Sequence, residues 1–472
     1  MASAVIHRLL CLAACGAALA ARAEGIVPEP LPDVHVPGFA FPESEATLTG
    51  WVAAASRDTP GAAPAVANIH VHGWGLWTAL TAETKQVVDG QPLRVFETWL
   101  ATDELAADPA TPLVTRPRHR APLRTLKKMS IASERPADPI ADPADDPEPV
   151  NRVLGFVKFD PTAAAHIARQ QLLRAAALDA LLDGGAQSIP PFPATALVVK
   201  PVFQVIHAAD LIDGRYFALK VWSGPPAIPQ AYPPAQWPGC VWLDLVGGGN
   251  GQGAVDEFPA SDGSSRTDET TYPLASIVSY RLSAADADAL NQGAPATKAA
   301  AGDTAVLVAM HVAGREIARW TWQTFWWTPA PDFPPAPSSR AIAGRRPAQL
   351  RGAPRHYAMA IAYTLFAPDQ PYVGGENVGA PVYAYNPWIE ARFAPSDLPD
   401  SQSLIDSSGR TLANNTGAQT NCLSCHVRAN YNPRLRATAP RFAGLRYTDL
   451  GDAQFVGTLQ VDFLWSIARH AR

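Results

Sequence analysis

The sequence predicts a mainly β fold of the α+β class, an antiparallel, hairpin-rich body with a few helices and a C-terminal segment of its own. Two observations lead to this prediction. The 472-residue chain contains 46 prolines, about twice ordinary usage, and proline interrupts both helices and central strands. Short runs of β-branched and aromatic residues also recur between clusters of turn residues.

The composition indicates a folded, globular chain. Hydrophobic residues make up 47% and charged residues 17% of the sequence, a balance that allows a sizeable core to be buried. The formal net charge of −5 is too small to imply a nucleic-acid partner.

The N-terminus has the pattern of a secretory signal peptide. An apolar run from Leu9 to Ala20 ends in Ala21-Arg22-Ala23, an A-x-A cleavage signal that predicts removal of residues 1–23. The alternative is a lipoprotein anchored at Cys15, within "LAAC". No later segment reaches the ~18 uninterrupted apolar residues of a membrane span, so we expect no integral membrane span and a periplasmic location.

Three regions follow the signal peptide. We predict an N-terminal β-rich region over residues 24–150 and a central β-rich body over 151–400. A C-terminal segment over 401–472 ends in a helix that begins near Asp452. The acidic, proline-rich stretch 135–150 is typical of a solvated loop and sets the first border.

Individual elements are predicted from periodicity and capping residues. Residues 68–77, "NIHVHGWGLW", alternate like a strand, and residues 91–100 form the next one after a turn at Asp89-Gly90. An amphipathic helix is expected over 161–183, capped by Asp160. Further strands are expected over 196–211, 214–224 and 240–246, a helix over 284–291 capped by Ser283, and two strands over 304–327 about Ala313-Gly314.

The chemistry of the chain is concentrated in "NCLSCH", residues 421–426. In a C-x-x-C-H motif, two thiols add across the vinyl groups of haem, and the adjacent histidine is held where it ligates the iron. Loss of residues 1–23 leaves only Cys240, Cys422 and Cys425. A zinc site lacks a second cysteine pair, and a dithiol redox site lacks its βαβ setting.

On these residues the chain resembles the c-type cytochromes. The resemblance implies one covalent haem c, with thioethers at Cys422 and Cys425 and His426 as the proximal iron ligand. It covers only this motif and the signal peptide. No methionine follows His426, and residues 408–420 make a poor helix, so the chain departs from the small cytochromes c on both sides of the motif.

The sixth iron ligand therefore stays open. His70 and His72 share one face of the predicted strand, where they would line a distal pocket or bind a second metal. Further candidates are His356, Met359 and His470, and a vacant position is the other alternative. Five arginines after the motif are suited to haem propionates or an acidic partner: Arg428, Arg434, Arg436, Arg441 and Arg446.

Three functions fit this motif. The first is an exported mono-haem cytochrome that passes electrons to a redox partner protein. The second is a periplasmic haem oxidoreductase with an open distal site that acts on a small molecule. The third is a haem-based ligand-binding or sensor protein. The large body upstream of the motif favours an enclosed haem, whereas no acid–base constellation is evident in the sequence.

Overall fold

The computed structural model describes residues 25–56, 61–106, 120–125, 153–371, 373–376, 378–398, 404–405, 411–412, 416–433 and 444–471. The predicted signal peptide, with Cys15, and the predicted loop 135–150 lie outside these residues. None of the described helices combines the length and the apolar character that crossing a bilayer would require.

A nine-stranded sheet forms the centre of the molecule. Its main strand order is β14-β13-β12-β7-β5-β4, and β11, β3 and β6 are attached at its side. Every pairing in it is antiparallel. The predicted α+β class with mainly antiparallel strands is therefore confirmed. The bounds are β3 Leu100–Ala101, β4 Arg124–Thr125, β5 Val153–Gly155, β6 Lys158–Phe159, β7 Leu197–Ile206, β11 Ser279–Arg281, β12 Thr304–Gly314, β13 Thr321–Trp327 and β14 Tyr357–Ala362.

The predicted hairpin over 304–327 is confirmed as β12 and β13. Its two strands pair as far as Gly314 and Thr321, so the connection is longer than the expected two-residue turn. Strand β12 also pairs along its whole length with β7, and this register places His311 opposite Lys200. Lys200 and His311 are the only ionisable residues of these two long central strands.

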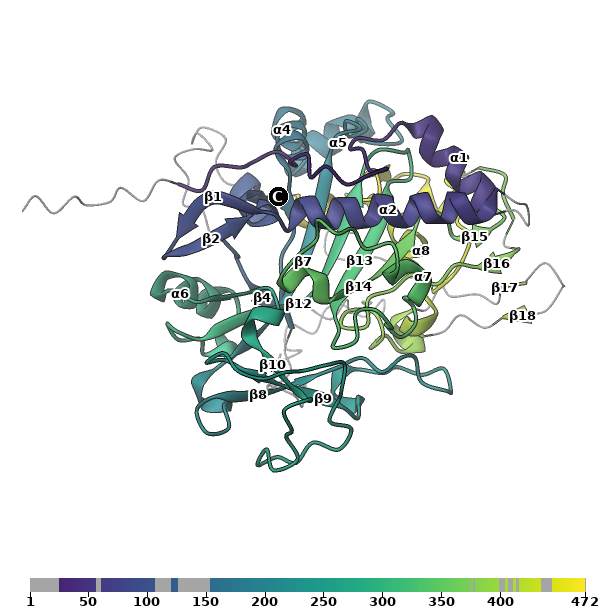
Figure 1. Ribbon diagram of the computed structural model, residues 1–472. Coiled ribbons are helices and arrows are strands. Elements are labelled where there is room, and N and C mark those ends of the chain that lie inside the picture. Colours follow the sequence, from purple (N-terminus) through teal and green to yellow (C-terminus); the bar gives the residue numbers. More distant parts are fainter. Residues whose placement is uncertain are drawn as a thin grey trace, which may run out of the picture.

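One face of the sheet is covered by helix α2 (Ala62–Leu80), with α1 (Glu45–Ala55) at its side (Figure 1). The prediction of a strand over 68–77 is wrong. The two-residue alternation there spans only a few positions, and short apolar runs do not distinguish strand from helix. Burial of Ala65, Ile69 and His72 at helical spacing decides the outcome.

Aromatic side chains pack α2 against the sheet. The ring of Trp77 stacks on that of Phe325 with centroids 4.3 Å apart. Gly73 is tightly packed against Met359, since a Cβ built at Gly73 would lie 2.8 Å from the Met359 sulfur. Met359 pairs with Phe325 across β13 and β14, so both side chains point toward α2.

A buried polar network joins α2 to the same face. His72 Nδ1 lies 2.6 Å from the Tyr363 hydroxyl, and His72 Nε2 lies 3.0 Å from a Glu316 carboxylate oxygen. Glu316 also accepts hydrogen bonds from the Glu43 backbone N–H and the Thr321 hydroxyl. The His72 and Glu316 side chains are only 1% and 0% exposed, so each depends on its partners for solvation.

The predicted helix 161–183 is two helices, α4 (Pro161–Gln170) and α5 (Ala175–Asp183). Asp160 caps α4 as expected. Gln171 then adopts a left-handed conformation with φ of 52° and ends it, which brings Leu172 and Leu173 into the core. The helix predicted over 284–291 is confirmed as α6 (Ala284–Gly293), with Ser283 as its N-cap.

Smaller sheets surround this centre. A three-stranded sheet consists of β8 (Tyr216–Lys220), β9 (Cys240–Asp244) and β10 (Thr271–Pro273). Cys240 is fully buried in it, and burial raises the pKa of its thiol to about 12. The remaining strands are β1 Glu83–Val88, β2 Gln91–Arg94, β15 Phe366–Ala367, β16 Ala380–Pro381, β17 Leu404–Ile405, β18 Thr411–Leu412, β19 Asn430–Tyr431 and β20 Leu459–Gln460.

Two other predicted elements differ from the structure. The strand expected over 91–100 divides into β2, the 3₁₀ helix η1 (Val95–Thr98) and β3. The C-terminal helix begins at Trp465 as α9 (Trp465–His470), because Asp462 and Phe463 have positive φ angles of 45° and 67°. The other short helices are α3 Thr102–Ala106, α7 Arg340–Ala343, η5 Ala208–Asp210, η6 Pro234–Gln236, η7 Leu274–Ser276, η8 Pro295–Thr297, η9 Ala353–His356, η10 Pro395–Asp397, η11 Gly417–Gln419 and η12 Ala453–Phe455.

The buried network predicts a large effect of substitution at Glu316. Replacing Glu316 by Ala leaves His72 and two other donors without their acceptor, and we expect a loss of about 3–5 kcal/mol in unfolding free energy. Urea titration measures this loss. Glu83→Ala is the control, because its ion pair with Arg94 lies at the surface and contributes about 1 kcal/mol or less. Equal effects of the two substitutions would contradict the prediction.

Candidate haem-attachment site

The C-x-x-C-H motif forms a single short helix, α8 (Cys422–His426). Asn421 caps it by accepting a hydrogen bond from the Leu423 N–H through its side-chain oxygen. The amide nitrogen of the same side chain donates to the carbonyls of Thr364 and Val382, at 3.1 and 2.6 Å. The Asn421 side chain thus begins the helix and fixes its start to the chain that follows β14.

His426 is held by the C-terminal segment. Its Nδ1 lies 2.7 Å from the Phe463 carbonyl oxygen, which accepts only, so Nδ1 carries the proton. Burial lowers the pKa of His426 to about 3, and the ring is therefore neutral at pH 7. In that tautomer Nε2 carries the lone pair that a metal requires.

The two cysteines of the motif are free thiols, and both are half-buried. Burial raises the pKa of Cys422 well above its ordinary value, and its thiol donates weakly to the Ala384 carbonyl at 3.4 Å. Cys425 packs beside Phe393 and Trp465. Neither thiol is consumed by a disulfide, so both remain available for chemistry.

This donor set fits a covalently attached haem. The requirement is two thiols and a neutral imidazole within one short segment, with the second ring nitrogen bonded to an acceptor. Cys422, Cys425 and the His426–Phe463 contact meet it. Within the described residues, no group of three or more histidine, cysteine or acidic side chains is arranged to hold a bare metal ion.

The motif packs on the face of the central sheet opposite α2. The His426 ring lies 4.0 Å, centroid to centroid, from the Trp322 ring. In β13, Trp322 points to the side opposite Phe325, which contacts α2. Trp326, four residues later in β13, lies on the same face as Trp322, whereas Trp320 precedes the strand with a φ of 63°.

Several sequence-predicted sixth ligands lie away from this face. Met359 packs against α2, and the His72 ring is occupied by Tyr363 and Glu316. The expectation that His70 and His72 share a strand face is wrong, because residues two apart on a helix point to different sides. His356 ends η9, at the start of β14.

His470 lies on the C-terminal helix that follows the Phe463 carbonyl. Its Nδ1 is 3.0 Å from the Ser466 carbonyl oxygen. It is the only sequence-predicted ligand on the segment that also holds His426, and it stays a candidate. Of the five arginines, Arg434, Arg436 and Arg441 lie outside the described residues. Arg428 donates to Gln454 at 2.6 Å, and Arg446 is half-buried.

A polar cluster beside the motif was not predicted from the sequence. Lys200 on β7 and His311 on β12 face each other across the two strands. His311 Nε2 lies 3.0 Å from a Glu390 carboxylate oxygen, and the other Glu390 oxygen accepts the Asn386 N–H at 2.6 Å. These residues are the Lys200–His311–Glu390 cluster. The strand register places Lys200, His311 and Trp322 on the same face of the sheet, and His426 packs on Trp322. The charges of all three cluster residues also influence the pKa of His426.

The cluster was detectable in principle. Lys200 is the only residue of β7 that is not buried, and His311 is the only such residue of β12. In the sequence each stands as the one ionisable residue of its strand. The sequence alone does not show the strand register that places Lys200 opposite His311. It also does not show that both lie beside the C-x-x-C-H motif, more than a hundred positions later in the chain.

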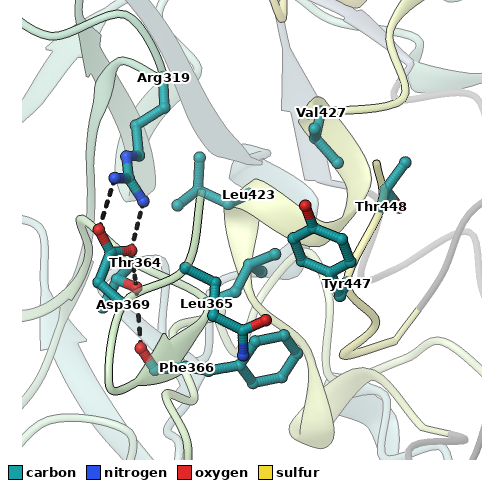
Figure 2. A pocket seen from close by; sticks show the side chains of 10 residues that line it. Arg319, Thr364, Leu365, Phe366, Asp369, Leu423, Val427, Tyr447 and Thr448 are labelled. Atoms are coloured by element: carbon teal, nitrogen blue, oxygen red, sulfur yellow. Dashed lines mark hydrogen bonds and ion pairs between the residues drawn. The ribbon is translucent and has the colours of Figure 1, made fainter. Parts of the chain in front are cut away.

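A small pocket lies on another side of α8 (Figure 2). Leu423 and Val427 line it together with Tyr447. At its edge Arg319 makes a two-fold ion pair with Asp369, at 2.5 and 2.6 Å. The cavity measures about 20 Å³, room for roughly one water molecule, so it is not the place of a haem.

Comparison with protein-family models, curated proteins and solved structures found no match for this chain.

The role of Asn421 can be tested by substitution. Asn421→Ala removes the N-cap of α8 and two hydrogen bonds to carbonyls, and we expect a loss of about 2–3 kcal/mol in unfolding free energy. Ser283→Ala, which removes the cap of the distant helix α6, serves as control with an expected loss of about 1 kcal/mol. Chemical denaturation compares the two. An Asn421→Ala loss no larger than the control would contradict the anchoring role.

Proposed function

We propose that this protein is an exported c-type cytochrome that carries one covalent haem and passes single electrons to a redox partner. Cys422 and Cys425 supply the thioethers, and His426 is the proximal iron ligand. The observation that carries the proposal is the hydrogen bond from His426 Nδ1 to the Phe463 carbonyl. It holds the imidazole as a neutral ligand in one tautomer.

The surroundings of the motif suit that role. Haem bound here supplies a one-electron couple, whose potential depends on burial and on nearby charge. Trp322 provides an apolar wall against His426, and the burial that keeps His426 neutral also limits access of water. A neutral proximal imidazole needs no proton loss before it binds iron.

The first test concerns covalent attachment in a host that matures c-type cytochromes. We expect haem to stay with the chain after denaturing electrophoresis and to be lost in the Cys422→Ser/Cys425→Ser double variant. Each single variant should retain one thioether, which shifts the absorption band of the pyridine adduct. Cys240→Ala, a change in a buried cysteine outside the motif, should leave haem content unchanged. Absence of covalent haem from the unchanged protein would refute the proposal.

A second function is favoured by the Lys200–His311–Glu390 cluster. An ionisable group beside a haem is the usual source of protons for small-molecule chemistry, and a simple electron carrier has no need of one. The second candidate is thus a haem oxidoreductase with an open distal position. His311, held by Glu390, would be its proton donor or acceptor.

Carbon monoxide distinguishes the two functions. For the proposed electron carrier we expect a low-spin haem with a filled sixth position, so carbon monoxide should leave the main absorption band of the reduced protein unchanged. Binding in a high-spin protein would support the oxidoreductase. A low-spin spectrum that carbon monoxide leaves unchanged would exclude the open site and favour the electron carrier.

A further inference from the structure

The Lys200–His311–Glu390 cluster contains a cation without a direct partner among the described residues. Among the described residues, no hydrogen bond or ion pair to the Lys200 ammonium is found. The Glu390 carboxylate acts on Lys200 through its charge, but its two oxygens are engaged by His311 and by the Asn386 N–H. A half-buried ammonium without a hydrogen-bond acceptor is costly, so such a group in a central strand requires an explanation.

The position of Glu390 is fixed independently of Lys200. The side chain of Asn386 donates to the Thr324 hydroxyl at 2.7 Å and to the Phe325 carbonyl at 2.9 Å. These bonds tie the loop that carries Glu390 to β13. Burial raises the pKa of Glu390, but the His311 ring and its hydrogen bond, the Asn386 N–H and the Lys200 charge together outweigh that effect and hold the pKa below its ordinary value. Glu390 is therefore the charged partner of His311.

The other charges around Lys200 do not neutralise it. Burial lowers the pKa of Lys200, the Glu390 carboxylate opposes that shift, and the positive charge of Arg469 on α9 adds to it. His426 lies within the influence of Lys200 and Glu390, and Cys422 lies within that of Glu390; neither carries a negative charge at pH 7. The two basic side chains, Lys200 and Arg469, thus face a region with one carboxylate that is already engaged.

We propose that Lys200 is the anchor of an anion site beside the Cys422–His426 motif, and that its ligand is a small carboxylate or oxyanion. An ammonium forms strong, charge-assisted hydrogen bonds to such oxygens. The Lys200–His311 pair is the one place where the central strands are not buried, so the anion has access there. Two sources supply this chemistry: a free anion, or a propionate of the haem assigned above, and only the second source rests on the proposed function.

The first experiment measures binding of a free anion. Formate and nitrite are titrated calorimetrically into the purified, haem-loaded protein at low salt and pH 7. We expect one saturable site, with affinity at least tenfold weaker in Lys200→Met, about the contribution of one charge-assisted hydrogen bond. Lys200→Arg keeps the charge and should retain most of the affinity. Lys85→Met, a change at an exposed lysine of β1, should bind as the unchanged protein does.

The second experiment identifies a haem carboxylate as the ligand. If neither free anion binds to the haem-loaded protein, resonance Raman spectra should show a shift of the propionate bending bands in Lys200→Met and none in Lys85→Met. Circular dichroism verifies that each variant is folded, and Lys200→Arg provides a folded comparison if Lys200→Met is unstable. The proposal is overturned if formate and nitrite do not bind and the propionate bands are the same in all variants.

Failure of this inference is separable from failure of the proposed function. Haem content is determined on the same preparations. If the chain retains no haem, calorimetry on that chain still tests the anion site, and saturable binding that depends on Lys200 supports it. If haem is retained but Lys200→Met changes neither anion binding nor the propionate bands, the anion site is refuted and the cytochrome proposal is unaffected.

Discussion

The central strands β7 and β12 are buried on both faces, and the desolvation of any polar side chain on them is the constraint on which the rest of the structure depends. Interior strands of this kind are built from apolar residues, and both follow that rule along nearly their whole length. A polar group on such a sheet must find partners from the layers above or below. Each face of this sheet solves the problem differently.

On the face that carries α2, the polar groups satisfy one another. His72, Glu316 and Tyr363 close a network whose every member has a partner, and burial raises the pKa of Tyr363 well above its ordinary value. Such a network specifies one arrangement of the helix on the sheet. On the opposite face, Lys200 remains without a partner among the described residues, and it is there that the C-x-x-C-H helix packs. The α2 face therefore carries the buried polar network, whereas the opposite face carries the C-x-x-C-H motif.

The sequence predicted local features better than their arrangement. Asp160 and Ser283 were recognisable as N-caps because capping acts within three residues. The C-x-x-C-H spacing is equally local, so the proposal of haem attachment could be made from five residues. The prediction of a strand over 68–77 is wrong because a short alternation fits both the two-residue period of a strand and the 3.6-residue period of a helix. Packing of Trp77 on Phe325 favours the helix. The Lys200–His311 pairing depends on strand register, which no local pattern specifies.

The turn at Asp462 and Phe463 has a consequence for the order of events in this molecule. Both residues have positive φ angles, and the Phe463 carbonyl accepts the hydrogen bond from His426 Nδ1. The motif precedes this turn in the chain, so the His426 imidazole has no fixed tautomer before residues 459–464 dock. In the proposed cytochrome, the thiols could react with haem on an unfolded chain, since they need only the motif. The tautomer and orientation of His426, by contrast, depend on the finished fold.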